Sequence, residues 1–172
     1  GTVVAVGSPG GGAYLAYNPN IQGTTKGDYL LTGGSQTDLP QNFNSFKIVG
    51  PGTLTVGQYL RLDSGGLLFD NSQGPFRISG GQPSALVFAG TGASTSNGEL
   101  IVTVGGTSNQ NALTIDTRVT AGGTSSLTKG GLGTLVIAGS NYYQGNTVIN
   151  AGTVRLSPTE FVDSDVTNLV VP

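Results

Sequence analysis

The chain has 172 residues and a formal net charge of -2, with seven Lys and Arg, nine Asp and Glu, and neither cysteine nor histidine. So few basic residues exclude electrostatic binding of nucleic acid, and the missing side chains exclude disulfides, thiolate metal sites and histidine catalysis. No apolar run approaches the roughly 18 residues of a membrane-spanning helix. Thirty glycines and short Val, Leu and Ile runs instead predict one β-rich, turn-rich domain.

The chain begins with a weakly patterned segment, residues 1–45, in which the best strand candidates are 2–6, 13–17 and 29–31. From residue 46 onward, short alternating strands recur between glycine turns, and no window has a helical period. The predicted strands are 46–49, 53–56, 60–63, 67–70, 76–79, 85–88, 99–102, 113–116, 135–137 and 154–156.

Self-similarity among these strands distinguishes a solenoid from a β-sandwich. The phrase Gly-Thr-hydrophobic-x-hydrophobic begins at Gly52, Gly133 and Gly152, and the offset between the last two copies is 154 − 135 = 19. A solenoid needs such a phrase because each coil places the same residue at the same stacked position. The sequence therefore predicts a single-stranded parallel β-helix with coils of roughly 20 residues and connections of variable length.

Both ends of a solenoid expose an open sheet edge that must be covered or paired. We therefore interpret 1–45 as a terminal coil with an N-terminal cap, 46–158 as the coils, and 159–172 as a tail whose end is a possible exchanged edge strand. If copies of the chain self-associate by adding a strand to a neighbour, the candidate assembly residues are Val3, Val4, Val166, Leu169, Val170 and Val171.

Three basic residues share an apolar–basic–apolar setting: Lys47, Arg61 and Arg77. Stacked in successive coils, they would form an outward column with about 4.8 Å between neighbours, with Asp63 and Asp70 as the nearest counter-charges. The alternative is that these are ordinary polar surface positions. Together with Tyr14, Tyr17 and Tyr142, the three basic residues are the candidate surface-binding residues, for carbohydrate or a host surface.

Residues 127–156 read LTKGGLGTLVIAGSNYYQGNTVINAGTVRL. This stretch resembles the autotransporter-associated β-strand repeat, also called the passenger-associated transport repeat, with Val154 in place of the usual leucine. The resemblance implies a right-handed β-helix exported to a bacterial cell surface, with no catalytic residue and no cofactor. The glycines of the repeat are expected where the coil turns or where a Cβ is costly, and Asn141 is expected to form an inward ladder or to cap a turn. Leu135, Ile137, Ile149, Val154 and Leu156 are expected to point inward.

Three functions are compatible with these features of the sequence. The leading one is a structural subunit, either a cell-surface stalk module or a filament built by end-to-end strand pairing. The second is an adhesin that binds carbohydrate through one solenoid face. The third, a polysaccharide-active enzyme, is disfavoured because the one acidic cluster, Glu160, Asp163 and Asp165, reads as a solvated turn. We therefore expect no enzyme activity, no cofactor and no metal site.

Overall fold

The computed structural model of the chain describes residues 15–16, 28–38, 41–80, 86–89, 98–106, 110–120, 124–157 and 169–170. In these ranges the backbone is almost entirely extended, and the only helical segment is one 3-10 turn, η1 (Asn71–Gln73). The same ranges contain no helix long and apolar enough to cross a membrane.

Fourteen strands form one sheet in which the described strand pairs are all parallel. They are β1 (Leu15–Ala16), β2 (Asp28–Asp38), β3 (Gln41–Val56), β4 (Leu60–Asp70), β5 (Phe76–Ser79), β6 (Leu86–Ala89), β7 (Glu99–Val104), β8 (Leu113–Asp116), β9 (Arg118–Val119), β10 (Ser126–Gly130), β11 (Thr134–Ile137), β12 (Thr147–Ile149), β13 (Thr153–Leu156) and β14 (Leu169–Val170). A sheet of parallel strands with short turns between them is an all-β solenoid, as the repeating phrase predicted.

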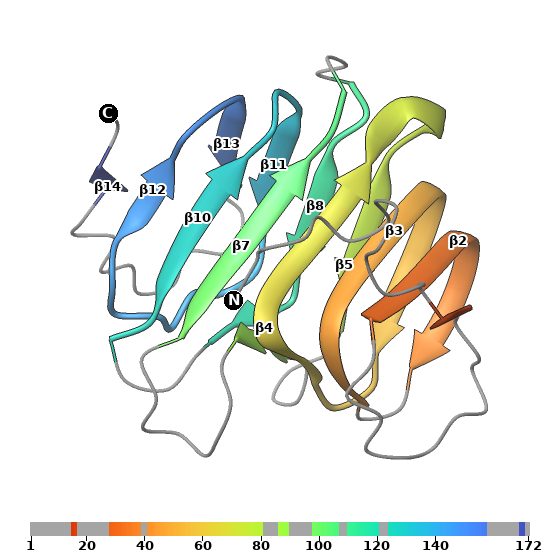
Figure 1. Cartoon of the computed structure of the whole chain (residues 1–172), viewed down its shortest axis with the longest axis horizontal. Helices are drawn as coiled ribbons and strands as arrows, with labels where there is room; N and C mark the ends of the chain where they lie inside the picture. The colour runs from red at the N-terminus through yellow and green to blue at the C-terminus, as the bar shows by residue number, and fades with distance from the viewer. Residues whose placement is uncertain are drawn as a thin grey trace, which may run out of the picture.

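The sheet folds into three faces because the long strands bend at corners and pair with different neighbours on either side of each bend (Figure 1). The front face consists of β1, 28–32, 45–49, 66–70, β7, β10, β12 and β14. The rear face consists of 34–38, 52–56, β5, β8, β11 and β13. The lower face consists of 41–43, 60–62, β6, β9 and Asn141.

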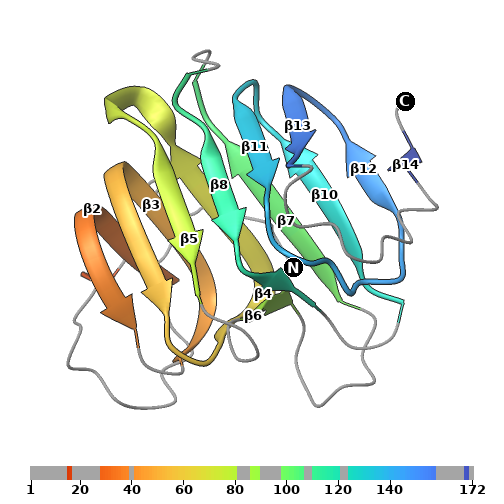
Figure 2. The ribbon, with the colours of Figure 1, turned by 180° about the vertical axis from the view of Figure 1, so that it is seen from behind.

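The solenoid is right-handed. In Figure 1 the front strands run upward while successive coils advance from right to left, and the view from behind in Figure 2 shows the rear strands running downward. A chain that rises in front, returns behind and advances leftward follows a right-handed coil, as the resemblance implied. Along each coil the order of faces is lower, front, rear.

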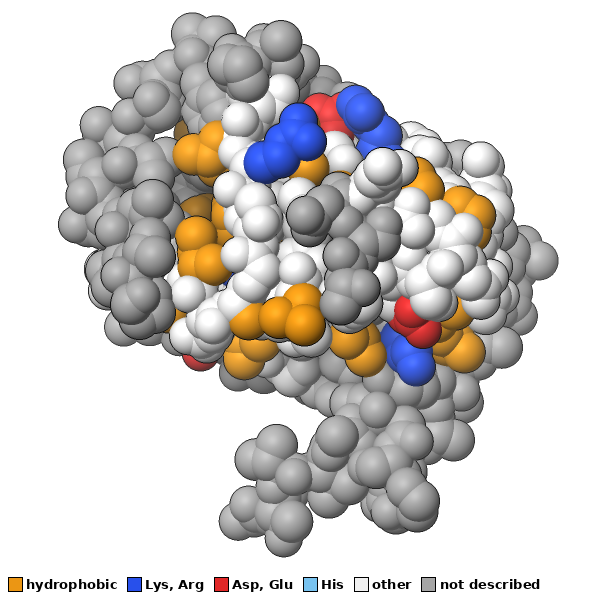
Figure 3. All heavy atoms as spheres, turned by 90° about the horizontal axis from the view of Figure 1, so that it is seen from above, with side chains coloured by type: hydrophobic (Ala, Val, Ile, Leu, Met, Phe, Trp, Pro, Cys, Tyr) orange, Lys and Arg blue, Asp and Glu red, His pale blue; other side chains and the backbone are white. Residues whose placement is uncertain are grey.

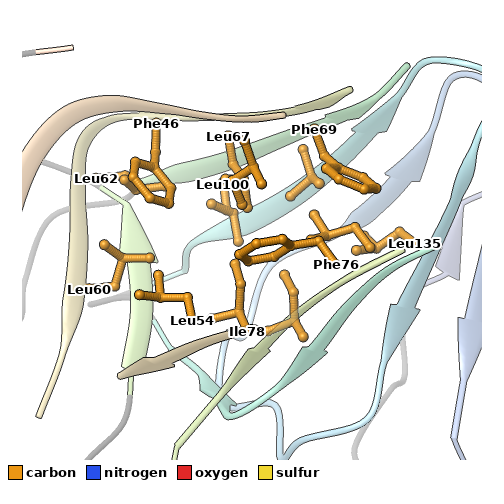
Figure 4. Packing of buried hydrophobic residues seen from close by; sticks show 14 of the residues in the cluster. Phe46, Leu54, Leu60, Leu62, Leu67, Phe69, Phe76, Ile78, Leu100 and Leu135 are labelled. Carbon is orange, nitrogen blue, oxygen red and sulfur yellow. The ribbon is translucent and has the colours of Figure 1, made fainter. Parts of the chain in front are cut away.

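Inward side chains from all three faces fill the interior (Figure 4). On the rear face residues 36, 54, 78, 115, 137 and 156 align in register as one column, and Leu54, Ile78, Ile115 and Ile137 in it point inward and are at most 1% exposed. Burial of such a column is a main stabilising contribution, because apolar area removed from water contributes about 25 cal/mol per Å². Stacking of equivalent residues thus gives the solenoid a continuous core.

The coils differ in length. One front-face column runs through Tyr29, Phe46, Leu67, Val102, Lys129 and Ile149, and its steps in residue number are 17, 21, 35, 27 and 20 (46 − 29, 67 − 46, 102 − 67, 129 − 102, 149 − 129). The strands keep their register because the differences in coil length fall between the strands of successive faces and not within them. Strands β2 and β3 begin at residues 28 and 41, so regular coils start before residue 46. The cap predicted for the N-terminal segment falls largely on residues outside the described ranges.

The repeated phrase stacks in two different registers on the rear face. Its copies at Gly133 and Gly152 are in register, with Leu135 beside Val154. In the copy at Gly52, however, Leu54 lies in the column of Ile137, two residues out of phase with Leu135. A shift of two residues preserves the inward and outward alternation, so the core accepts both registers.

Candidate functional site

The C-terminal end of the solenoid carries the assembly candidates that the structure describes. Leu169 and Val170 form β14, which pairs in parallel with β12 of the same chain, Leu169 beside Thr147. This strand therefore extends the front face of its own chain. The other candidates, Val3, Val4, Val166 and Val171, lie outside the described residues.

Next to β14, the rear face ends at β13. Within the described chain, β13 pairs with β11 on one side and with no strand on the other. Leu156 was expected to point inward, and it aligns with the core residue Ile137, but it is 46% exposed whereas Ile137 is 1% exposed. Its exposure follows from its place in the last coil, since no described strand lies beyond β13 to cover it. Ile149 and Val154, also in the last coil, are half-buried.

The predicted column of basic residues does not form. Lys47 lies on the front face between Leu30 and Leu68, Arg61 on the lower face between Asn42 and Phe88, and Arg77 on the rear face between Thr53 and Thr114. The sequence offsets of 14 and 16 are shorter than the coils at these positions, which take 21 residues from Lys47 to Leu68 and 27 from Arg61 to Phe88 (68 − 47, 88 − 61), so each step along the sequence leads to another face.

Two of these basic side chains are placed beside acidic ones. Arg61 Nε lies 2.9 Å from Asp63 Oδ1, as the counter-charge prediction anticipated, and Arg77 pairs with Asp116 in the neighbouring coil. Viewed from above, the surface is largely uncharged, and basic side chains lie next to acidic ones (Figure 3). The described residues hold no group of three acidic side chains close enough to bind a metal ion, and the cluster at 160–165 is outside them.

Asp70, the other predicted counter-charge, stands at the start of η1. Its carboxylate accepts a hydrogen bond from Ser72 N at 3.0 Å. Hydrogen bonds from Ser72 are the main cause that lowers the pKa of Asp70, and the nearby charge of Lys47 adds a smaller part. Asp70 therefore acts first as a turn-capping residue and only second as a counter-charge.

Tyr142 is exposed on the lower face, as the surface-binding prediction requires. Its side chain is 54% exposed, and the guanidinium carbon of Arg118 lies 4.5 Å from the ring centroid. This cation–π contact holds one side of the ring in place. Tyr14 and Tyr17 lie outside the described ranges.

Lys129 is the most unusual side chain of the repeat because it lies in the core. It occupies the front-face column between Val102 and Ile149 and is 0% exposed. Its Nζ donates hydrogen bonds to the carbonyl oxygens of Gly130 at 2.6 Å, Gly131 at 2.7 Å and Ala151 at 3.2 Å. Burial lowers the pKa of Lys129 from 10.5 to about 8. The ammonium thereby joins the front-to-rear corners of two successive coils.

Close approach of neighbouring coils explains most of the glycines of the repeat. Gly131 and Gly152 have φ values of +73° and +75°, which side chains rarely adopt. Gly133, Gly139 and Gly145 are required for space instead, because a Cβ on them would lie 2.5, 2.1 and 2.6 Å from atoms of the preceding coil. A side chain is thus costly at all five positions, as the sequence predicted, and at Gly131 and Gly152 both reasons apply because a Cβ there would also lie 2.2 and 2.4 Å from backbone oxygens of the preceding coil.

Asn141 does not form the contacts expected of it. Its amide nitrogen and oxygen are buried and make no hydrogen bond, although the residue forms a parallel bridge with Val119. It follows Val119 on the lower face, and no described strand lies beyond it there to continue a ladder. The neighbouring Tyr143 hydroxyl instead bonds Thr147 Oγ1 at 2.7 Å.

Comparison with known proteins identifies one segment of the chain. Residues 127–156 match the family model described as passenger-associated-transport-repeat. No curated protein and no solved structure matches the chain significantly. The matched segment begins at Leu127 in β10 and ends at Leu156 in β13, and it contains Lys129 with all three of its carbonyl partners. The C-terminal coils of this right-handed β-solenoid are therefore a passenger-associated transport repeat, as their sequence indicated.

Proposed function

We propose that the chain is a structural module displayed outside a bacterial cell, and that copies join end to end through β-strand pairing. The repeat at 127–156 supports the extracellular setting, because its family is associated with autotransporter passengers. A non-catalytic role is supported by the placement of charged side chains: Arg61 and Arg77 form ion pairs with neighbouring carboxylates, and Lys129 holds two coils together.

The rear edge at β13, beyond which no described strand lies, is the observation that carries the proposal. A sheet edge with unpaired backbone groups and an exposed core residue is a template for another strand. Here it is combined with parallel coils, so a second copy added at this end continues the same core. Because such a contact joins two different ends of the molecule, its repetition produces a filament rather than a closed dimer.

The test is a measurement of assembly in the purified full chain. Sedimentation velocity across a range of protein concentrations should show growing oligomers, and negative-stain electron microscopy should show fibres. The front face holds eight strands among the described residues, so a continuous stack predicts an axial repeat of about 38 Å at about 4.8 Å per strand. Monomers at every concentration would contradict the proposal.

Binding of carbohydrate is the second candidate, and the exposed Tyr142 ring supports it. An aromatic ring held by Arg118 presents a flat apolar surface with a polar hydroxyl, which suits a sugar. The Tyr142→Ala variant should lose binding on a glycan array, whereas Leu132→Ala, at a residue 62% exposed, should retain it. An array without signal for the parent chain would count against this candidate.

A further inference from the structure

The C-terminal end of the solenoid is stepped. On its front face β14 covers β12, whereas on its rear face β13 is the last described strand. The front face is therefore one described strand longer than the rear face at this end. Because the faces follow one another in the order lower, front, rear, the position that follows β14 is that of a rear-face strand, and no described strand occupies it.

The exposed edge has the chemistry of a strand-binding site. Thr153 N donates to Gly133 O at 3.3 Å and Ser157 N to Ile137 O at 3.0 Å, so alternate residues of β13 bond the preceding coil. The backbone N–H and C=O groups of the intervening residues, Val154 and Leu156, must then point away from it. Leu156 adds a half-exposed apolar side chain aligned with the core column.

The order of faces along the chain identifies a segment that fits. The chain passes from each residue of the rear-face column to the next residue of the front-face column through a connection of variable length. The three shortest connections take 10, 13 and 12 residues (46 − 36, 67 − 54 and 149 − 137). Leu15, in β1, occupies that front-face column beside Tyr29. Subtracting the same range of steps from 15 gives positions 5 to 2 (15 − 10, 15 − 13). A rear-face strand joined to β1 by a short connection therefore belongs there.

We infer that residues 2–6 of a second copy, Thr-Val-Val-Ala-Val, pair in parallel with the outer edge of β13 and complete the rear face of the last coil. This inference rests on the proposed end-to-end assembly and assigns its joint. The segment is uncharged, rich in Val and free of proline, all of which favour a paired strand. In the same joint, β1 of the second copy lies next to β14 of the first copy on the front face. The front and rear faces therefore both continue from one copy into the next.

The inference selects one end of the chain as the donor strand. Of the two termini suggested by the sequence, the C-terminal strand already pairs with β12 of its own chain. The N-terminal segment is the donor and β13 is the acceptor. Since donor and acceptor lie in different parts of the chain, each copy supplies one of each, and assembly continues without closing.

Cysteine cross-linking tests the joint directly, because the chain has no cysteine of its own. The acceptor variant is Arg155→Cys, which places a thiol on the exposed, outward side of β13. The donor variants are Val3→Cys, Val4→Cys and Ala5→Cys, one at a time. Adjacent strands bring Cα atoms to about 5 Å, within the range for a disulfide. The matched control, Thr114→Cys, lies in the same outward column but between two strands of its own chain.

Mixing the acceptor with each donor under mild oxidation should give covalent dimers, and efficiency should alternate along the donor because only every second side chain points outward. At least a fivefold excess over the Thr114→Cys control is expected. If the parent chain forms fibres but no donor cross-links above the control, the assigned joint is overturned while end-to-end assembly stands. If the parent chain stays monomeric, both are overturned.

A proline at Leu156 gives an independent readout. Its N–H points away from β11, so Leu156→Pro removes a donor from the outer edge of β13 without removing a hydrogen bond between β13 and β11. The variant should keep the parent's circular dichroism spectrum and fail to elongate. Fibres of normal length from a correctly folded Leu156→Pro chain would overturn the inference. If that variant misfolds, the cross-linking result alone decides.

Discussion

Raising the pH from 8 to 10 is expected to stabilise the folded chain, because Lys129 is buried without a counter-charge among its hydrogen-bond partners. Burial lowers the pKa of Lys129 from 10.5 to about 8 in the folded state. In the unfolded chain the side chain returns to its ordinary value of about 10.4. Between these two values the unfolded state binds more protons than the folded state, so the free energy of unfolding rises with pH.

The size of the effect follows from the difference between the two pKa values. A difference of about 2.5 units corresponds to about 3 kcal/mol, of which about 2 kcal/mol is gained between pH 8 and pH 10. Below pH 8 Lys129 is protonated in both states, so this gain in the free energy of unfolding is absent there. For a chain of this size the gain corresponds to an increase in melting temperature of roughly 4 to 8 °C.

Urea unfolding followed by circular dichroism at pH 7, 8, 9 and 10 measures the effect. The control is Lys129→Met, which keeps a long apolar stem but has no titrating group, and its stability should not rise over this interval. The scan ends at pH 10 because burial raises the pKa of Tyr143. Above pH 10 the unfolded chain loses this proton more readily than the folded chain, so the tyrosine lowers the free energy of unfolding as pH rises further. A parent chain whose stability is flat or falls between pH 8 and 10 would refute the reasoning, as would an equal rise in Lys129→Met.

Three further substitutions test the packing. Gly139→Ala should lower the free energy of unfolding by at least about 2 kcal/mol, because its Cβ would lie 2.1 Å from a backbone oxygen of the preceding coil. Gly34→Ala, in open space at φ +80°, should lower it by about 1 kcal/mol. Thermal melts of the two variants measure the difference. In the same core column, Ile137→Ala should cost about 3 kcal/mol and the exposed Leu156→Ala under about 1 kcal/mol; equal losses would mean that Leu156 is covered. Arg77→Ala should cost under about 1 kcal/mol, less in high salt, because its ion pair is exposed.

Alternation along single strands made the fold class and most of the core predictable. Inward and outward positions follow the two-residue period wherever a strand is covered on both sides, as at Leu135 and Ile137. The register between coils was harder to predict. The phrase at Gly52 looks identical to the one at Gly133, but it stacks two residues away, because connections of different length change where a coil enters the rear face.

The side chains that matter most for the site depend on distant parts of the chain. Lys129 has the same strand parity as Leu127, which places it inward, but its third carbonyl partner, Ala151, is 22 residues away. The basic column failed for the same reason, since a sequence offset does not reveal which face a residue occupies. Exposure of Leu156 arises because no described strand follows β13 on the rear face, which the local pattern does not encode. The strands at 126–130 and 147–149 were not singled out, because serine, threonine and lysine weaken their apolar pattern.

The stacking of parallel coils has a mechanical consequence. The hydrogen bonds between coils run along the axis of the solenoid, so tension applied to its two ends loads the bonds of the outermost coil before those of the next. Such a molecule yields in steps, one coil at a time, instead of in one cooperative rupture. The spacing between stacked residues ranges from 14, between Leu15 and Tyr29, to 37, between Ile78 and Ile115, so each step releases roughly 50 to 130 Å of extended chain at about 3.4 Å per residue. A row of such modules would lengthen gradually under load while its remaining coils stay folded.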